Sequence, residues 1–339
     1  MKIKRSFALF LCSILLFTGC SHESRPEVSK TFFAMDTVMN FSVYGDEKIL
    51  DQTETIISDL ESQMSVTDSG SQIAALNKNG SVTLTGDTRT LVQKALSLCE
   101  RTNGALDLSI YPIVRAWGFT TGKYQVPDDH TIGSLLPLVD YKQIQYEPES
   151  GEISLPNDME IDLGSVAKGY AGQKVADYLK ENGVTSGLLS LGGNIQAIGS
   201  KPDGSPWKIG IQDPRNNEEP MMVLSISDQS VVTSGGYERY FEEDGKTYWH
   251  IMDPKTGYPA ENGLISVTIV GDDGMLCDGL STSLFVMGLE KAADFCGKSN
   301  DFEAVFVTDD GTVYITEGLK NSFALTDDYQ DTVVRVIKR

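Results

Sequence analysis

Asp278 and Thr282 are four residues apart, so on a helix their carboxylate and hydroxyl groups would share one face. Oxygen ligands of this kind suit Mg²⁺, which takes few protein ligands and leaves coordination positions for phosphate oxygens. The same spacing is typical of a helix with an N-terminal Asp cap and a Thr that faces the core. Both interpretations stay open, and the pair is a candidate magnesium site.

A second stretch, from Asp162 to Tyr170, combines an acidic residue, a turn of small residues and a helix start with Lys168 in its first turn. The free N–H groups and the positive dipole end of a helix start favour phosphate binding. The stretch matches neither a Walker loop nor the GxGxxG motif. Taken alone, it is also compatible with a capped helix that carries a solvated lysine.

Two more segments contain candidate residues. Gly192 and Gly193 follow an apolar strand, where paired glycines form a tight turn or allow close approach to the backbone. His250 precedes a turn at residues 253–257, and its imidazole suits general-base catalysis because it titrates near neutral pH. A single histidine is more often structural, so neither segment identifies a reaction by itself.

The composition argues against several classes of protein. The 339 residues carry a formal net charge of −20 and only 3 His. Binding of nucleic acid requires a basic face, which this acidic excess opposes. The scarcity of His and the lack of a CxxC pair argue against a zinc or haem site. Any bound metal is therefore expected to be a hard ion held by oxygen.

The N-terminal residues are expected to precede the folded domain. Residues 1–19 form a basic segment followed by an apolar stretch too short for an ordinary membrane span. They end in small residues before Cys20, which is similar to a bacterial lipoprotein signal; a plain secretory peptide and an uncleaved anchor are the alternatives. We expect lipidation of Cys20, a polar tether over residues 20–30, and a location on the extracytoplasmic side of the cell membrane.

Three cysteines remain in the body of the chain, Cys99, Cys277 and Cys296. An odd number cannot pair completely within one chain, and a domain of this size needs no disulfide for stability. We interpret them as small buried apolar residues, with a Cys277–Cys296 disulfide as the lesser alternative.

Periodicity predicts the elements that position these residues. Apolar spacing predicts helices over residues 49–64, about 87–104, about 165–181 and about 278–287. Strands are predicted over residues 32–44 (strand or hairpin), 187–197, 207–212, 221–227, 247–251, 264–270, 304–307 and 312–316. Because most strands follow one another through short turns, we predict an α+β fold. A single large domain over residues 31–339 would contain mostly antiparallel sheets and flanking helices.

Taken in their order along the chain, several short motifs resemble those of the ApbE-type FAD:protein FMN transferases. The resemblance covers about residues 31 to 320. The segments that carry the resemblance are Phe33–Thr37, Gly104–Ser109, Asp162–Tyr170, Leu191–Asn194, His250–Pro254 and Cys277–Thr282. The resemblance implies an architecture related to the T-fold. It also implies an extracytoplasmic, Mg²⁺-dependent enzyme that transfers the FMN half of FAD to a Thr or Ser hydroxyl of an acceptor protein and releases AMP.

The resemblance also implies roles for individual residues. FAD would contact Met35, Ala105, Leu106, Asp107, Asp162, Lys168, His250 and Ile251. Mg²⁺ would be held by the side chains of Asp278 and Thr282 and by a backbone oxygen around Ser165. His250 would be the catalytic general base for the incoming hydroxyl. Lys168 and the metal would neutralise charge on the phosphoryl oxygens.

Two positions depart from the family pattern. Asp36 stands where Gly is usual after the early Met, which would alter the local turn, and Thr67 stands where many members carry a Tyr able to stack on the flavin. The second departure bears on flavin affinity and on the balance between transfer and hydrolysis.

Two other functions stay open. One is a Mg²⁺-dependent FAD pyrophosphatase that releases FMN and AMP, and the other is a non-catalytic FAD-binding lipoprotein. The presence of His250, Asp278 and Thr282 together favours an enzyme, because storage of FAD needs no base beside a metal.

Overall fold

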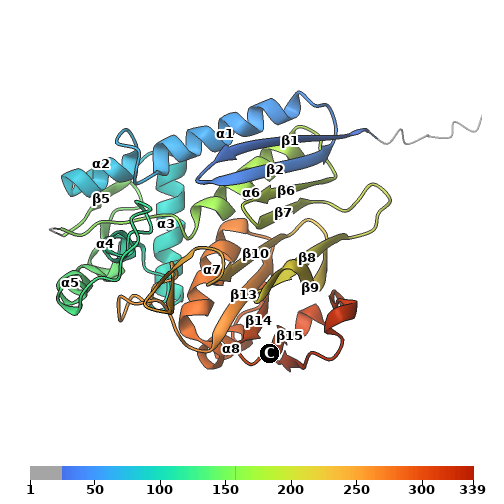
Figure 1. The fold of residues 1–339 in the computed structure, drawn as a ribbon. Coiled ribbons are helices and arrows are strands. Elements are labelled where there is room, and N and C mark those ends of the chain that lie inside the picture. Colours follow the sequence, from blue (N-terminus) through green and yellow to red (C-terminus); the bar gives the residue numbers. More distant parts are fainter. Residues whose placement is uncertain (1–24, 157) are drawn as a thin grey trace, which may run out of the picture.

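A nine-stranded sheet is the centre of the computed structural model, which describes residues 25–156 and 158–339 (Figure 1). The strand order is β1-β2-β6-β7-β10-β13-β14-β15-β17, and neighbours are antiparallel except for the parallel pair β15 and β17. Its strands are β1 (Glu27–Ala34), β2 (Thr37–Tyr44), β6 (Gly187–Leu191), β7 (Asn194–Ile198), β10 (Ser230–Gly235), β13 (Leu264–Gly271), β14 (Phe302–Thr308), β15 (Val313–Thr316) and β17 (Val334–Ile337).

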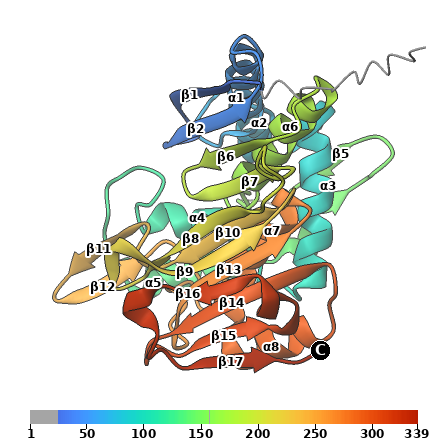
Figure 2. The same cartoon turned by 90° about the vertical axis from the view of Figure 1, so that its right-hand side faces the viewer.

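Alternating side chains of this sheet contribute to two hydrophobic cores. In β13, Val267 and Ile269 belong to one core and Val270 to the other, as the two-residue period of a strand requires. The first core lies under the helices α1 (Ile49–Met64), α3 (Gly86–Arg101), α6 (Ala167–Glu181), α7 (Gly274–Met287) and α8 (Leu289–Gly297). The second core lies under a three-stranded sheet of β16 (Phe323–Leu325), β9 (Asn216–Ile226) and β8 (Trp207–Asp213) (Figure 2).

A third, smaller cluster surrounds the buried Trp117 and includes Ile113, Phe119, Ile132 and Met252. The indole N–H of Trp117 donates to the backbone oxygen of Gly257 at 2.8 Å, which fixes the turn that follows His250.

The remaining elements are α2 (Gln72–Asn79), β3 (Ser81–Thr83), η1 (Leu108–Ile110), α4 (Tyr111–Ala116), α5 (Asp129–Leu135), η2 (Leu136–Leu138), η3 (Tyr141–Gln143), β4 (Gln145–Tyr146), β5 (Glu152–Ser154), β11 (Tyr240–Glu243), β12 (Lys246–Trp249), η4 (Glu317–Asn321) and η5 (Asp327–Tyr329).

The α+β class and the mostly antiparallel sheets agree with the prediction, and the helix predicted over residues 49–64 is confirmed as α1. Several predicted boundaries were wrong, including the following three. The segment 187–197 is two strands joined by a turn, and α7 begins at Gly274 with Asp273 as its cap, so Asp278 lies in its second turn. Strand β1 begins at Glu27, so residues 27–30 belong to the sheet and not to the tether.

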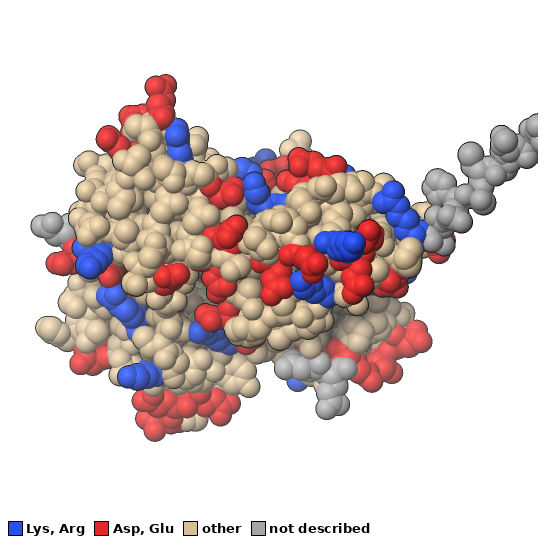
Figure 3. Space-filling view, turned by 90° about the horizontal axis from the view of Figure 1, so that it is seen from above, with Lys and Arg blue, Asp and Glu red and all other residues tan. Residues whose placement is uncertain are grey.

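The three body cysteines, Cys99, Cys277 and Cys296, are buried free thiols, as expected, and the alternative disulfide is absent from the described part of the chain. The predicted signal segment and Cys20 lie outside the described residues. Within residues 25–156 and 158–339, every helix is too short or too polar to cross a membrane. The face seen from above carries many acidic side chains with fewer basic ones between them, in keeping with the net charge of −20 (Figure 3).

Candidate active site

One cleft of about 700 Å³ brings together the residues predicted to contact FAD or the metal. Its walls include the β1–β2 turn, the start of α6, the β6–β7 turn, the end of β10 and the second and third turns of α7. The predicted residues that line it are Met35, Ala105, Leu106, Asp107, Asp162, Ser165, Lys168, His250, Ile251, Asp278 and Thr282. These residues are spread over some 250 positions of the chain, so the fold is what assembles them.

The crossing of α6 and α7 places the carboxylate of Asp278. This carboxylate accepts a hydrogen bond of 2.8 Å from the backbone N–H of Gly169, in the first turn of α6. A Cβ atom on Gly169 would lie 2.1 Å from the backbone oxygen of Gly274, so the two helices approach this closely only because residue 169 is glycine. Burial raises the pKa of Asp278, and the Lys168 ammonium and the Gly169 N–H oppose that shift.

Lys168 lies among carboxylates at the start of α6. Burial raises the pKa of Asp162, and the backbone N–H groups of Gly164 and Leu163 and the charge of Lys168 oppose that shift. Burial raises the pKa of Glu238 to about 7, with Lys168 lowering it and Asp278 raising it. A cation and a helix N-terminus at one wall of a cleft form a suitable environment for an anionic group such as a phosphate.

The donor atoms around Asp278 fit Mg²⁺ and not a softer metal. The hydroxyl of Thr282, one turn further along α7, lies 3.4 Å from the Ser234 hydroxyl. The described residues contain no group of three or more His, Cys, Asp or Glu side chains that could hold a metal by themselves. One carboxylate with neutral oxygens is the kind of partial shell that Mg²⁺ completes with water and substrate phosphates.

His250 follows strand β12 directly, and its hydrogen bond determines which ring nitrogen is free. Its Nδ1 atom lies 3.2 Å from the backbone oxygen of Arg239. A carbonyl oxygen can only accept, so Nδ1 carries the proton and Nε2 is left with its lone pair. Burial lowers the pKa of His250 to about 4, the Arg239 oxygen opposes this, and the charges of Lys168 and Arg239 lower it further. The ring is therefore neutral at pH 7.

Two tight turns meet at the cleft. Met35 and Asp36 both have positive φ, 49° and 58°, in the two-residue turn between Ala34 and Thr37, which is the type I′ pattern. Asp is among the non-glycine residues that tolerate this conformation, so Asp36 occupies the turn where Gly is usual. Gly192, in the β6–β7 turn, has φ 60°, and a Cβ there would lie 2.2 Å from the Thr37 hydroxyl oxygen.

Asp107 lines the cleft, but its side chain is used locally. One carboxylate oxygen accepts from the backbone N–H and hydroxyl of Ser109 at 2.9 and 2.6 Å, and the other accepts from the backbone N–H of Tyr141 at 3.0 Å. Asp107 therefore shapes the loop that carries Ala105 and Leu106. Thr67 also lines the cleft.

Several cleft residues were not predicted. Asn194 is buried beside Asp278 and lowers the pKa of that carboxyl group, and Glu61 accepts the backbone N–H of Met35 at 3.0 Å. Glu238 and Arg239 face the cleft from the loop before β11. Glu238 and Arg239 could have been found from the sequence, because they are two charged residues flanked by aromatic residues in the segment Tyr237–Phe241. Nothing in the sequence singled out Glu61.

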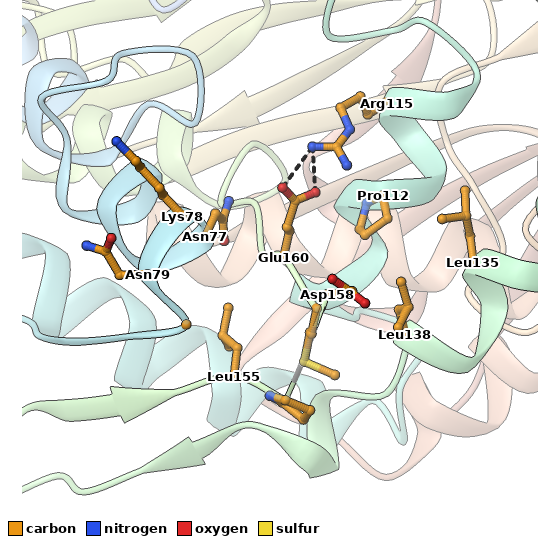
Figure 4. A pocket seen from close by; sticks show the side chains of 13 residues that line it. Asn77, Lys78, Asn79, Pro112, Arg115, Leu135, Leu138, Leu155, Asp158 and Glu160 are labelled. Atoms are coloured by element: carbon orange, nitrogen blue, oxygen red, sulfur yellow. Dashed lines mark hydrogen bonds and ion pairs between the residues drawn. The ribbon is translucent and has the colours of Figure 1, made fainter.

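A separate cavity of about 420 Å³ lies on the other side of α4 (Figure 4). Ile110 and Val114 line the cleft, whereas Pro112 and Arg115 line this second cavity, so α4 separates the two. Arg115 forms an ion pair with Glu160 there. None of the predicted site residues within the described chain lines this second cavity.

Comparisons with known proteins agree with this geometry. Residues 35–306 match the sequence profile of the ApbE family. The chain is 30% identical over 321 residues to the FAD:protein FMN transferase of Vibrio cholerae, covering 91% of this chain and 95% of that protein. It is 33% identical over 287 residues to an FAD:protein FMN transferase of Klebsiella pneumoniae, covering 83% and 89%. The crystal structure of the ApbE protein of Thermotoga maritima superposes with a TM-score of 0.82 at 31% identity, covering 87% of this chain and 98% of that one.

Proposed function

This chain belongs to the ApbE family and is a flavin transferase enzyme, and from that premise we propose the reaction in detail. It transfers the FMN half of FAD to a Thr or Ser hydroxyl of an extracytoplasmic acceptor protein, with Mg²⁺ bound, and releases AMP. The observation that carries the proposal is the single cleft that joins a neutral imidazole, a cation at a helix start and a carboxylate–hydroxyl pair.

His250 removes the proton from the acceptor. The lone pair of its Nε2 atom takes this proton, because the Arg239 oxygen holds the ring proton on Nδ1. The acceptor oxygen then forms a bond to the phosphorus of the FMN phosphate while the pyrophosphate P–O bond breaks. AMP leaves with that electron pair, and the hydroxyl proton stays on His250. General-base catalysis of this kind typically contributes about 10²–10⁴-fold to the rate.

Lys168 and the start of α6 stabilise the negative charge of the two phosphates. The ammonium group and the first turn of α6, which is the positive end of the helix dipole, lie at the same wall of the cleft. Mg²⁺, held by Asp278, Thr282 and an oxygen around Ser165, would supply further positive charge at the phosphoryl oxygens. Asp278 is kept in place by the Gly169 N–H, and the buried Asn194 amide lies beside it.

We also propose that Cys20 carries lipid and that residues 1–19 are removed. The supporting observations are the basic segment, the short apolar stretch and the small residues before Cys20. The enzyme would then work on the outer side of the cell membrane, where its acceptor would be found.

A labelling experiment separates the proposed reaction from its alternatives. The chain without its first 19 residues is incubated with FAD and Mg²⁺, with or without the extracytoplasmic proteins of the cell that makes it. Flavin fluorescence that persists on an acceptor band after denaturation supports transfer. Free FMN and AMP without a labelled band indicate a pyrophosphatase, and unchanged FAD indicates a protein that only binds it.

A further inference from the structure

The exposed large hydrophobic side chains of the described residues are not evenly distributed. They are Phe33, Val38, Tyr124, Tyr240, Val333 and Val336. The last two lie on or beside β17, at the far edge of the central sheet. The first four flank the cleft from two sides.

On one side, Phe33 and Val38 form a cross-strand pair in the β1–β2 hairpin. They are 71% and 50% exposed, and the three residues that line the cleft, 35–37, come directly between Ala34 and Val38. The next pair on the same face is polar, with the Thr31 hydroxyl donating to the Asn40 side-chain oxygen at 2.8 Å. The exposed apolar pair Phe33–Val38 therefore lies at the end of the hairpin next to the cleft, whereas the next pair on the same face is polar.

On the other side, Tyr124 is stacked on Phe241, with ring centroids 5.3 Å apart and planes at 10°. Phe241 in turn lies 5.8 Å from Phe119, which lines the cleft. Tyr240 is 49% exposed and directly follows Arg239, another cleft residue. The hairpins β1–β2 and β11–β12 project on the same side of the molecule in Figure 2, and residues 35–37 and 237–239, in or next to these hairpins, line the cleft.

We propose that Phe33, Val38, Tyr124 and Tyr240, here named the mouth patch, are the docking surface for the acceptor protein. The proposal rests on the proposed function, because a protein hydroxyl must enter this cleft and the protein that carries it must then cover the rim. Exposed apolar groups that gather around a site, on a chain of net charge −20, mark a surface that a partner buries. The partner would present its Thr or Ser on a projecting segment flanked by apolar side chains.

A membrane surface is the other occupant that exposed aromatic residues suggest, and the charges near the mouth disfavour it. Asp36 in the β1–β2 turn and residues 242–244 in the β11–β12 hairpin are exposed and acidic. Anionic lipid attracts basic segments and repels acidic ones. An apolar protein surface is not repelled in this way.

The test uses the acceptor that the wild-type enzyme labels, purified, as the probe. Phe33→Ser and Tyr240→Ser are compared with Val333→Ser, which removes an apolar side chain of intermediate exposure, 55%, at the far edge. We expect the KM for the acceptor to rise about tenfold in each mouth-patch variant, the size typical of a central apolar contact. The kcat at saturating acceptor and the affinity for FAD should stay at the wild-type values, as should every value for Val333→Ser.

Three results would overturn the proposal. The first is a KM for the acceptor that is unchanged in both mouth-patch variants. The second is a loss of FAD affinity or kcat in those variants with no change in that KM. The third is binding of the enzyme without its first 26 residues to phosphatidylglycerol vesicles, abolished by Phe33→Ser, which would assign the patch to the membrane. Failure of the proposed function is distinct, since the wild-type enzyme would then label no protein at all.

Discussion

At the scale of single residues, the imidazole of His250 has the most specific environment in the cleft. Its Nδ1 proton is held by the Arg239 carbonyl oxygen, so Nε2 is the atom available to the acceptor. We predict that His250→Ala transfers FMN about 10²–10⁴-fold more slowly, without total loss, because the metal and Lys168 still act on the phosphates. The measurement is single-turnover transfer at saturating FAD, with a titration of FAD binding. A wild-type rate with weakened FAD binding would instead assign His250 to the wall of the flavin pocket.

The lowered pKa of His250 also predicts a pH dependence. The proposed base would work only when neutral, and His250 is neutral above its pKa, which lies at about 4 in the free enzyme instead of the ordinary 6.5. The kcat/KM for FAD reports the free enzyme, so its histidine-dependent acidic limb should lie well below pH 6.5.

Glu238, with a pKa of about 7, provides the control for that profile. An inflection near neutral pH that disappears in Glu238→Gln belongs to this carboxyl group. An inflection near pH 6.5 that survives in Glu238→Gln and disappears in His250→Ala would show that the histidine is not shifted.

Asp278 carries the only carboxylate among the three proposed metal ligands. We expect Asp278→Asn to weaken Mg²⁺ binding and abolish transfer at low Mg²⁺, with partial recovery as the Mg²⁺ concentration is raised, because the amide keeps an oxygen but loses the charge. Isothermal titration with Mg²⁺ in the presence of FAD measures the affinity directly. Full activity of this variant in excess chelator would contradict the assignment.

At the scale of elements, the contact between α6 and α7 sets the position of Asp278. A Cβ on residue 169 would lie 2.1 Å from the Gly274 oxygen and 2.6 Å from the Asp278 Cβ. Gly169→Ala should therefore force the helices apart, lowering the free energy of unfolding by about 1–3 kcal/mol or more and weakening Mg²⁺ binding as well.

Gly133→Ala is the matched control, since a Cβ at residue 133 in α5 meets no atom within 4 Å. Replacing this helical glycine should stabilise the protein by up to about 1 kcal/mol. Thermal unfolding of the two variants measures both effects. Equal melting temperatures would mean that the α6–α7 contact yields more easily than the geometry indicates.

These helices also show what can be predicted from sequence. The apolar stripe of α1 identified its two ends because only one face is buried. Helix α7 is buried on nearly all sides, so its periodicity did not reveal that it begins at Gly274. Strand β10 was missed for a related reason: it is six residues long, and its pairing with β13 joins residues far apart in the chain.

The site, like these elements, could be predicted only in part from the sequence. The order of several motifs, through resemblance to a family, named eleven of the residues that line the cleft. The contact that determines the tautomer of His250 comes from a backbone oxygen, so no residue type signals it. For Asp107 the resemblance implied a contact with FAD, and the structure adds a local role that the sequence did not indicate, because its carboxylate oxygens accept hydrogen bonds from Ser109 and Tyr141.

At the scale of the whole molecule, we expect the N-terminal segment to determine where the enzyme works. We predict that Cys20→Ala no longer incorporates labelled fatty acid and is lost from the membrane fraction, unless its signal segment is retained. A lipoprotein carries more than one acyl chain, which is enough for stable anchoring, so the wild type should stay with the membrane. Equal fatty-acid labelling of the two proteins would contradict lipidation at Cys20.

Strand β1 connects the proposed anchor segment to the cleft. It begins at Glu27, next to the proposed anchor segment, and ends at Ala34, beside the cleft. Eight residues at about 3.3 Å each place these points about 25 Å apart, and the seven residues from Cys20 to the strand can add at most about 25 Å. Because β1 pairs with β2 along its whole length, the part of the distance between Cys20 and the cleft that β1 spans is rigid. If Cys20 carries lipid as proposed, the cleft stays within about 50 Å of the bilayer. An acceptor hydroxyl held farther from the bilayer than this would be out of the enzyme's reach.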